Sequence, residues 1–377
     1  MAEEVHEGLE GVVVTESVLS HIDGEAGRLI YRGHAIEDLA REASYEEVLY
    51  LLWHGTLPDA TALEAFETSM AGQRAIDDGV METARTLAEA DEAPMSALRT
   101  LVSSLSAFVT DAGETVDEAT NRRKGQRITA KLPTALAAFE RARRGEEIVP
   151  PREDLGHAAN FLYMLNGEAP DEVMAETFDM ALVLHADHGL NASTFSSMVT
   201  ASTLADMHAA VTSAVGTLSG SLHGGANQAV MELLIELDEA GADPVAFVEE
   251  RLAEGQRIPG FGHRVYRVKD PRARILGEKS AELGDAGGDA KWYDYSVAIE
   301  EHLQAEKGLA PNVDFYSAST YYQMGIPVDL YTPIFALSRV GGWVAHVLEQ
   351  YDGNRLIRPR AKYVGPESAT FVPLAER

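Results

Sequence analysis

The chain contains no cysteine among its 377 residues. This absence excludes disulfide bonds, a cysteine nucleophile, and thiolate ligands for zinc or iron–sulfur clusters. Long apolar runs are also missing: the run at 180–184 is far shorter than the roughly 20 residues that cross a bilayer. Residues 1–20 begin with acidic residues and lack the basic and then apolar pattern of a secretory signal. We therefore expect a soluble, cytoplasmic protein with no membrane partner.

Basic residues are scarce. The chain has 31 Lys and Arg against 60 Asp and Glu, a formal net charge of −29, and only seven of the basic residues are Lys. The electric field of such a negative chain should repel nucleic acids and anionic lipids at ordinary ionic strength. We therefore expect no nucleic-acid partner. At about 1 M salt the Debye length falls to roughly 3 Å and this self-repulsion is screened. We interpret the composition as that of a protein from a salt-rich cell. An ordinary acidic cytosolic enzyme is the alternative.

The length and the 45% of apolar residues allow two domains and a sizeable core. Most segments carry helical periodicity, which predicts a mainly α fold. Ser44 and Glu47 form a capping-box pattern before a helix that Gly55 can end. Other start and stop signals, together with amphipathic stretches, predict helices that begin at Asp243-Pro244 and at Thr332-Pro333 and that cover 155–165, 170–184 and 226–239. A short hairpin is predicted within 11–31, and glycine-rich loops at 255–262 and 284–288.

Four segments in the second half of the chain place ionisable residues among Gly, Asn or Pro: 185–191, 222–227, 259–263 and 311–314. In the first of them, two His three residues apart on a helix would share a face, so His185, Asp187 and His188 could hold a metal ion in a hydrolase. A helix end with His and Asn would also suit an anionic ligand, and a structural pair of His is a third interpretation.

His223 and His263 each lie in a glycine-rich segment, where the backbone can bend sharply and a substrate can approach closely. Two such His could each donate a hydrogen bond to a developing oxyanion. Either could also be a loop residue without a function. Asp314 is flanked by apolar and aromatic residues, a setting that raises the pKa of a carboxyl group and makes it a competent base. A plain helix cap is the alternative for Asp314.

Residues 264–274 reverse the acidic trend, since Asp270 is their only acidic residue against Arg264, Arg267, Lys269, Arg272 and Arg274. Guanidinium groups bind carboxylates and phosphates in bidentate fashion, so a small polyanion is the favoured partner. A solvated helix face is the alternative. Residues 122–127 form a second basic stretch, which we interpret as a surface loop.

Together these segments resemble the citrate synthase family. The motifs His-Ala-Asp-His-x-x-Asn-Ala-Ser-Thr, Leu-His-Gly-Gly-Ala-Asn, Pro-Gly-Phe-Gly-His-Arg-Val-Tyr with Asp-Pro-Arg, and Asn-Val-Asp occur here in the order of that family. Weaker similarity extends over nearly the whole chain, at 31–33, 51–58, 130–133, 160–170 and 331–339. The chain departs from many relatives at Gly189, where they often carry an acidic residue.

The resemblance implies that His223, His263 and Asp314 are the catalytic residues of a condensation between acetyl-CoA and oxaloacetate, followed by thioester hydrolysis. It implies four residues that bind oxaloacetate: His188, Arg272, Arg339 and Arg358, the last reaching in from a partner subunit. It also implies contacts to coenzyme A from Pro259, Gly260, Phe261, Gly262, Arg267, Lys269 and Lys307. No metal and no cofactor are expected, because the coenzyme A thioester is a substrate.

The resemblance further implies an almost entirely helical homodimer whose active site is shared between subunits. Each chain would have a large domain, 1–222 with 323–377, and a small domain, 223–322, that closes on oxaloacetate. A 2-methylcitrate synthase that uses propionyl-CoA is the nearest alternative. A metal-dependent hydrolase and a non-catalytic acyl-CoA sensor are the others.

Overall fold

The computed structural model describes residues 5–113, 117–263, 265–287 and 289–377. Within these ranges the chain forms sixteen α-helices and one small three-stranded sheet. The prediction of a mainly α fold is therefore confirmed. Among the described residues, no helix combines the length and the apolar character needed to span a membrane.

The sheet is an antiparallel meander near the N-terminus, made of β1 (Ser20–Asp23), β2 (Arg28–Tyr31) and β3 (His34–Ala35). Ser20 pairs with Tyr31 and Asp23 pairs with Arg28, so the hairpin predicted within 11–31 is present. The backbone N–H of Asp187 donates to the Tyr31 hydroxyl at 3.1 Å, and that hydroxyl donates to the Asp187 carbonyl oxygen at 2.7 Å. The sheet thereby supports the turn that follows helix α8 (Glu172–His185).

Ten helices precede the 222–227 segment: α1 (Ile36–Glu42), α2 (Tyr45–His54), α3 (Ala60–Ala71), α4 (Asp78–Glu89), α5 (Pro94–Leu105), α6 (Glu118–Arg143), α7 (His157–Asn166), α8 (Glu172–His185), α9 (Ala192–Ser202) and α10 (Met207–Leu218). Six more begin at residue 226 or later: α11 (Ala226–Ala240), α12 (Pro244–Ala253), α13 (Pro271–Gly287), α14 (Lys291–Lys307), α15 (Val313–Gln323) and α16 (Tyr331–Asp352). Short 3-10 helices lie at Glu7–Leu9, Ser106–Phe108, Val328–Leu330 and Leu374–Glu376.

The predicted helix ends follow from local capping. Ser44 accepts a hydrogen bond from the Glu47 amide at 3.2 Å, and the Glu47 carboxylate accepts one from the Ser44 amide at 2.8 Å. Gly55 ends this helix, α2, in the left-handed conformation with a φ of 88°. At the start of α12, the Asp243 side chain caps the helix by accepting a hydrogen bond from the Ala246 amide at 3.0 Å.

Two loop predictions are wrong. The basic stretch 122–127 lies inside α6, where Asp117 caps the start and Arg and Lys are good helix formers. Gly284 to Gly287 continue α13, while residue 288 lies outside the described residues. A Cβ atom on the buried Gly284 would lie 3.0 Å from the Cα atom of Ala290. The glycine here lets the following segment of the chain approach α13 closely. The sequence pattern does not distinguish such a glycine from one in a flexible loop.

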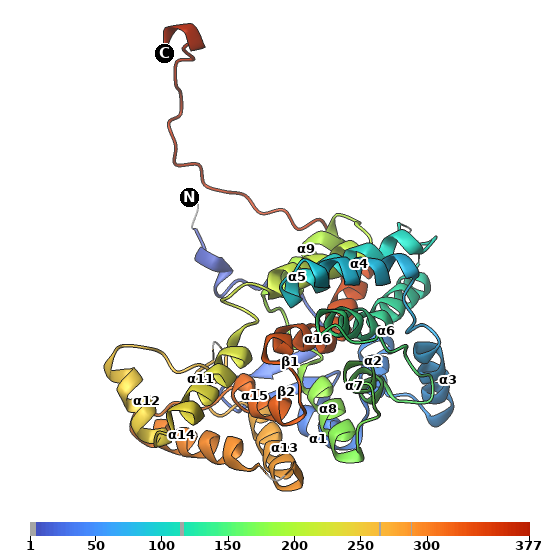
Figure 1. The fold of residues 1–377 in the computed structure, drawn as a ribbon. Helices are drawn as coiled ribbons and strands as arrows, with labels where there is room; N and C mark the ends of the chain where they lie inside the picture. Colours follow the sequence, from blue (N-terminus) through green and yellow to red (C-terminus); the bar gives the residue numbers. More distant parts are fainter. Residues whose placement is uncertain (1–4, 114–116, 264, 288) are drawn as a thin grey trace.

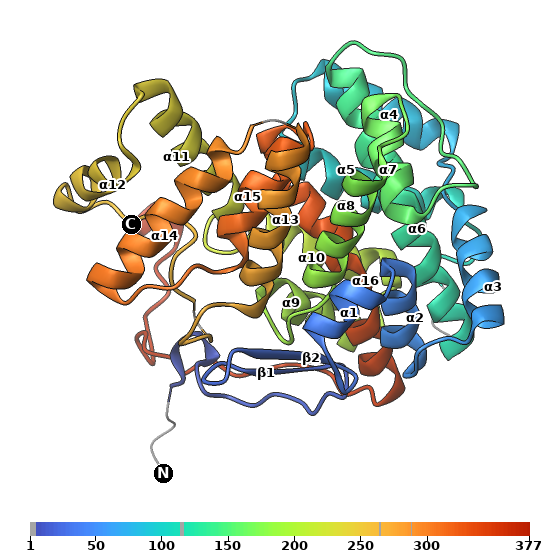
Figure 2. The same cartoon turned by 90° about the horizontal axis from the view of Figure 1, so that it is seen from below.

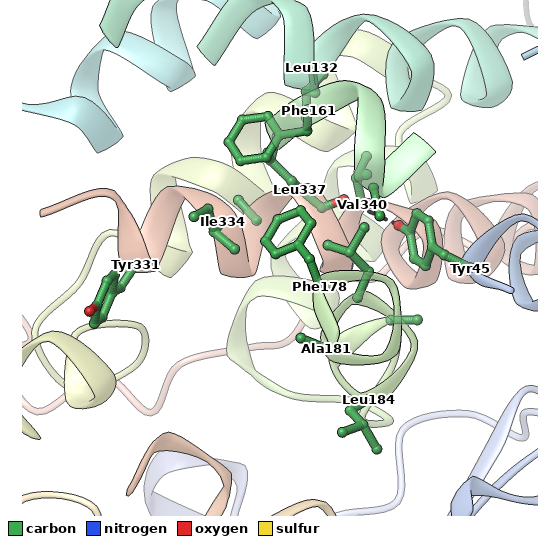
Figure 3. Close-up of a cluster of buried hydrophobic side chains, with 14 of the residues drawn as sticks. Tyr45, Leu132, Phe161, Phe178, Ala181, Leu184, Tyr331, Ile334, Leu337 and Val340 are labelled. Carbon is green, nitrogen blue, oxygen red and sulfur yellow. Dashed lines mark hydrogen bonds between the residues drawn. The ribbon is translucent and has the colours of Figure 1, made fainter. Parts of the chain in front are cut away.

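Helix α16 is the centre of the core and is buried along nearly its whole length. It contacts α2, α6, α8, α9 and α10. Figure 3 shows Ile334, Leu337 and Val340 of α16 beside Phe161 of α7 and Phe178 of α8. The Phe161 and Phe178 rings stack with centroids 5.4 Å apart. This packing fixes the position of α16, which also carries site residues.

Helices α11, α12 and α14 form one side of the molecule in both Figure 1 and Figure 2. Helices α13 and α15 connect them to the rest, through contacts of α13 with α1 and α8. Helices α11 to α15 cover Ala226–Gln323. The division of the chain into a large domain and a small domain at 223–322 stays a prediction. After α16, residues 353–377 extend away from the helical body (Figure 1).

Candidate functional site

One cavity of about 510 Å³ collects the residues that the four motifs singled out. Its walls come from the turn after α8, the loop before α11, the 259–263 loop, and helices α13, α15 and α16. The side chains with chemistry that line it are His188, Asn191, His223, His263, Arg272, Asn312, Asp314 and Arg339. Segments more than 100 residues apart in the chain thus meet at one place.

Two loops of this cavity are tied together by backbone hydrogen bonds. The Asn312 amide donates to the Gly260 carbonyl oxygen at 2.9 Å, and the Gly262 amide donates to the Ala310 carbonyl oxygen at 3.1 Å. Gly260 has a φ of +80°, and a Cβ atom there would lie 2.7 Å from a methyl carbon of Val230. Only glycine fits, because both the backbone conformation and the space exclude a side chain. These contacts place His263 near Asp314.

His223 is half-buried in the loop before α11. The Ser193 amide, in the first turn of α9, donates to His223 Nε2 at 3.1 Å, and the Ser193 hydroxyl lies 2.9 Å from the same nitrogen. An amide can only donate, so Nε2 must hold a lone pair and the imidazole proton must lie on Nδ1. Burial, together with the charge of Arg339, lowers the pKa of His223 to about 4. His223 is therefore a neutral N–H donor at physiological pH.

His263 has the opposite tautomer. Its Nδ1 accepts hydrogen bonds from the backbone amides of Val265 at 2.9 Å and Tyr266 at 3.1 Å. The imidazole proton must then lie on Nε2. Burial, together with the charge of Arg272, lowers the pKa of His263 to about 4. The site thus holds two neutral imidazoles whose N–H groups lie on different ring nitrogens.

Asp314 is the second residue of α15. The cap of that helix is Asn312, whose side-chain oxygen accepts the Asp314 amide at 3.0 Å, so Asp314 is not the cap. Burial raises the pKa of Asp314 from 3.8 to about 6, although Arg272 and Arg339 pull the pKa down. A carboxyl group with such a pKa is ionised at neutral pH and still basic enough to accept a proton.

Two nearly fully buried arginines supply positive charge to the cavity. Arg272 donates from Nε and Nη2 to Asp270 at 3.0 and 2.7 Å. Although burial alone would lower it, the carboxylate of Asp270 raises the pKa of Arg272. Arg339 donates to the His185 carbonyl oxygen at 2.6 Å and lies over the Phe335 ring. Burial lowers the pKa of Arg339 to about 10, so it keeps its charge at neutral pH. Two fixed guanidinium groups favour an anionic ligand.

The three residues considered for a metal site are not arranged as one. Helix α8 ends at His185, so His188 lies in a turn and the two His do not share a helix face. Asp187 accepts hydrogen bonds from Ser20 at 2.5 Å and contacts His346 at 3.1 Å, away from His185, whose Nδ1 contacts the Ala181 carbonyl oxygen. Within the described ranges, no group of three or more His, Asp or Glu could hold a metal ion.

His188 differs from its two neighbours because it lines the cavity. Burial and the charges of Arg272 and Arg339 hold the pKa of His188 well below its usual range. Its Nε2 is buried and has no hydrogen-bond partner among the described residues. The ring packs edge-on against that of His263, with centroids 5.4 Å apart. His188 therefore has an N–H or a lone pair available for a ligand.

Other predicted site residues lie outside the cavity lining. Arg358 is exposed on the extended C-terminal segment, where it lines a separate groove with residues of the N-terminal segment. Lys269 is half-buried, donates to Glu300 at 2.6 Å and lies over the Tyr316 ring, so its charge is already paired. Arg267 and Lys307 are exposed, the latter at the end of α14. Arg264 lies outside the described residues.

Phe261 packs the 259–263 loop against α15. The centroids of the Phe261 and Phe315 rings lie 4.6 Å apart, and the backbone of Phe261 pairs with that of Pro311.

Sequence reasoning missed Ser193 and Asp270 as partners of His223 and Arg272. The Asn-Ala-Ser-Thr cap and the Asp-Pro-Arg triplet contained both residues, but only the tertiary contacts show what they hold.

Comparison with known proteins agrees with this geometry. The chain is 65% identical to the citrate synthase of Haloferax volcanii, with all of both chains covered. It is 49% identical to citrate synthase 2 of Bacillus subtilis, with 98% of each covered, and 39% identical to 2-methylcitrate synthase 1 of Corynebacterium glutamicum, with 99% of each covered.

A solved citrate synthase of Thermoplasma acidophilum, in a ternary complex with carboxymethyl coenzyme A and oxaloacetate, superposes with a TM-score of 0.91 at 32% identity over the full length of both chains. Residues 8–360 match the family described as citrate synthase, C-terminal domain. This chain belongs to the citrate synthase family, a family of acyltransferases.

Proposed function

We propose that this protein condenses acetyl-CoA with oxaloacetate and hydrolyses the resulting thioester to citrate and coenzyme A. The observation that carries the proposal is the cavity itself. A carboxylate with a raised pKa, two neutral imidazoles with their N–H groups on different ring nitrogens, and two buried guanidinium groups surround one space. The 65% identity to a citrate synthase, against 39% to a 2-methylcitrate synthase, favours acetyl-CoA as the acyl donor.

In the first step, the Asp314 carboxylate takes a proton from the methyl group of acetyl-CoA. The negative charge moves to the thioester oxygen, where the Nδ1–H of His223 donates a hydrogen bond to the enolate. A neutral donor suits this task because it stabilises the oxygen without first competing with Asp314 for the proton. Ser193 keeps the His223 proton on Nδ1 by donating to Nε2.

In the second step, the enolate carbon attacks the keto carbon of oxaloacetate. The Nε2–H of His263 donates to the keto oxygen, which becomes an alkoxide and takes this proton to form the hydroxyl of citryl-CoA. The proton that Asp314 took from the methyl group balances the one that His263 gives up. Water then cleaves the thioester and releases citrate and coenzyme A. Arg272, Arg339 and His188 bind the two carboxylates of oxaloacetate, and their fixed positions leave little reorganisation for the bound state.

The remaining assignments complete the proposal. Arg358 reaches the site of a second chain in a homodimer. Coenzyme A lies along the 259–263 loop, where its phosphates meet Arg267 and Lys307; Lys269 must first leave Glu300 to join them. The small domain closes over oxaloacetate, so that water is excluded until condensation is complete. No step uses a metal or a further cofactor, and the protein works in the cytoplasm.

A free-thiol assay with oxaloacetate and either acetyl-CoA or propionyl-CoA tests this function. We expect the higher kcat/KM with acetyl-CoA, with some activity on propionyl-CoA, because one methylene group changes transition-state binding by only about 1–3 kcal/mol. A clear preference for propionyl-CoA would show a 2-methylcitrate synthase. Binding without thiol release would show a sensor, and loss of activity to a chelator would favour the hydrolase.

The acid limb of the pH profile should report Asp314. Since the base must be ionised, kcat/KM should fall as pH drops through about 6, close to tenfold per pH unit below it. His223 and His263 stay neutral over this range because their pKa values lie near 4. Kinetics between pH 4.5 and 8.5 measure the limb, and a midpoint near 4 would contradict the raised pKa.

Stability should depend on salt. With a net charge of −29, the folded chain repels itself until salt shortens the Debye length from about 10 Å at 0.1 M to about 3 Å at 1 M. We expect the unfolding midpoint to rise steadily with KCl. Sucrose at matched osmolality is the control, since it favours burial without screening charge. An equal rise in both solutes would contradict the electrostatic explanation.

A further inference from the structure

Behind His223 lies a short relay of hydrogen bonds that begins in the core. Trp343 of α16 is fully buried, and its indole Nε1–H donates to the Ser193 hydroxyl oxygen at 3.1 Å. That oxygen lies 2.9 Å from His223 Nε2 and 2.7 Å from the side-chain oxygen of Asn191. The relay thus connects the central helix of the fold with an imidazole at the cavity.

The donors and acceptors along this relay restrict one another. An indole N–H can only donate, so Trp343 occupies one lone pair of the Ser193 hydroxyl oxygen. The hydroxyl has a single proton, and its two other neighbours are the side-chain oxygen of Asn191 and His223 Nε2. The Asn191 oxygen already accepts the amides of Ser193 and Thr194, both at 3.1 Å. The hydroxyl donates to the same oxygen at 2.7 Å, and the Ser193 amide donates to His223 Nε2 at 3.1 Å. The indole N–H of Trp343 therefore fixes the place of a hydroxyl that lies directly against the imidazole.

Loss of the indole N–H would remove the contact that holds the Ser193 hydroxyl against α16. The hydroxyl and the amide of Ser193 both contact His223 Nε2, so a shift of Ser193 would move the imidazole with it. The tautomer would stay the same, because the amide still donates to Nε2. The Nδ1–H would keep its proton and lose its fixed position.

We infer that Trp343 is a positioning residue for the condensation, acting through the Ser193 hydroxyl on the orientation of His223. This inference rests on the proposed function, in which the Nδ1–H of His223 stabilises the enolate. The role concerns kcat, since none of the three groups in the relay is assigned to hold the carboxylates of oxaloacetate.

Trp53 offers a matched control. It is also a buried tryptophan, and its indole N–H donates to the carbonyl oxygen of Gly341 in the same helix, α16, at 2.9 Å. Trp53→Phe therefore removes an indole hydrogen bond to α16 without changing the relay to His223. Any effect of general loosening of α16 should be shared by Trp53→Phe and Trp343→Phe.

The test measures kcat, KM and the unfolding midpoint for Trp343→Phe, Trp53→Phe, Ser193→Ala and the double variant of Trp343 and Ser193. Trp343→Phe should lower kcat about three- to tenfold, the worth of one hydrogen bond, with the KM for oxaloacetate within about twofold. Trp53→Phe should lose similar stability and keep its kcat. In the Ser193→Ala background, Trp343→Phe should have no further effect on kcat.

Independent effects of the two substitutions, or an equal loss of kcat in Trp53→Phe, would overturn the inference. If the wild-type protein released no thiol at all, the proposed function would fail instead. A second measurement needs neither activity nor a Trp343 variant: nitrogen NMR of the His223 imidazole, assigned with His223→Gln. We expect the proton on Nδ1 in the wild type and also in Ser193→Ala, because the backbone amide of residue 193 still donates to Nε2. A wild-type proton on Nε2 would overturn the inference.

Discussion

Asp314→Asn should lower kcat by roughly 10²-fold or more, because the amide cannot accept the methyl proton of acetyl-CoA. Asn keeps the size of the side chain, and the Asn312 cap of α15 depends on the backbone amide of residue 314, which the substitution leaves in place. Steady-state kinetics in the free-thiol assay measure the loss. Calorimetric titration should show that oxaloacetate still binds, since Arg272 and Arg339 are unchanged.

The control is Asp285→Asn, which removes an exposed carboxylate from α13 and should leave kcat within about twofold. The residual activity of Asp314→Asn should also lack the acid limb near pH 6. Full turnover in this variant would show that another group is the base, and the remaining carboxylate near the cavity, Asp270, would be the first candidate.

His263→Asn should lower kcat by about 10²- to 10³-fold, the usual cost of one oxyanion donor. The side-chain oxygen of Asn can take the place of Nδ1 and accept the amides of Val265 and Tyr266, so the loop should keep its form. No N–H then reaches the keto oxygen of oxaloacetate. Kinetics give the loss, and infrared spectroscopy of bound oxaloacetate should show a less polarised carbonyl group.

His302→Asn serves as the matched control, because His302 lies on α14 and contacts Glu249 at 2.7 Å, away from the cavity lining. Its kcat should stay close to that of the wild type. An unchanged carbonyl frequency in His263→Asn, with kcat intact, would remove His263 from the mechanism and leave polarisation of the keto group to Arg272, Arg339 or His188.

Much of the fold was predictable because helix ends are local. Capping by Ser44, Asp243 and Asn191 involves amides only two or three residues away, so short sequence patterns contain the whole interaction. The prediction of a surface loop at 122–127 failed because a distant helix packs against this stretch: a Cβ atom on Gly125 would collide with the side chain of Val344 in α16. A distant helix also pairs part of the basic stretch 264–274, since Glu300 of α14 accepts a hydrogen bond from Lys269.

The site was predictable as a set of residues and not as an arrangement. His223, His263 and Asp314 lie in distinctive local sequences, and the family resemblance assigns them to one reaction. Their shared cavity depends on backbone bonds between the 259–263 and 310–312 segments. Ser193 and Trp343, 150 residues apart, carry no local sign that they touch.

The sequence by itself determined the available chemistry: a cysteine-free, strongly acidic, helical chain with His, Asp and Arg in glycine-rich segments. Tertiary structure alone decided which nitrogen of each imidazole carries the proton and how far burial moves the pKa of Asp314 and both His. The physical reason is that a tautomer depends on the donors that face each ring nitrogen, and a pKa depends on lost solvent and nearby charge. Both are set by atoms that meet only after the chain has folded.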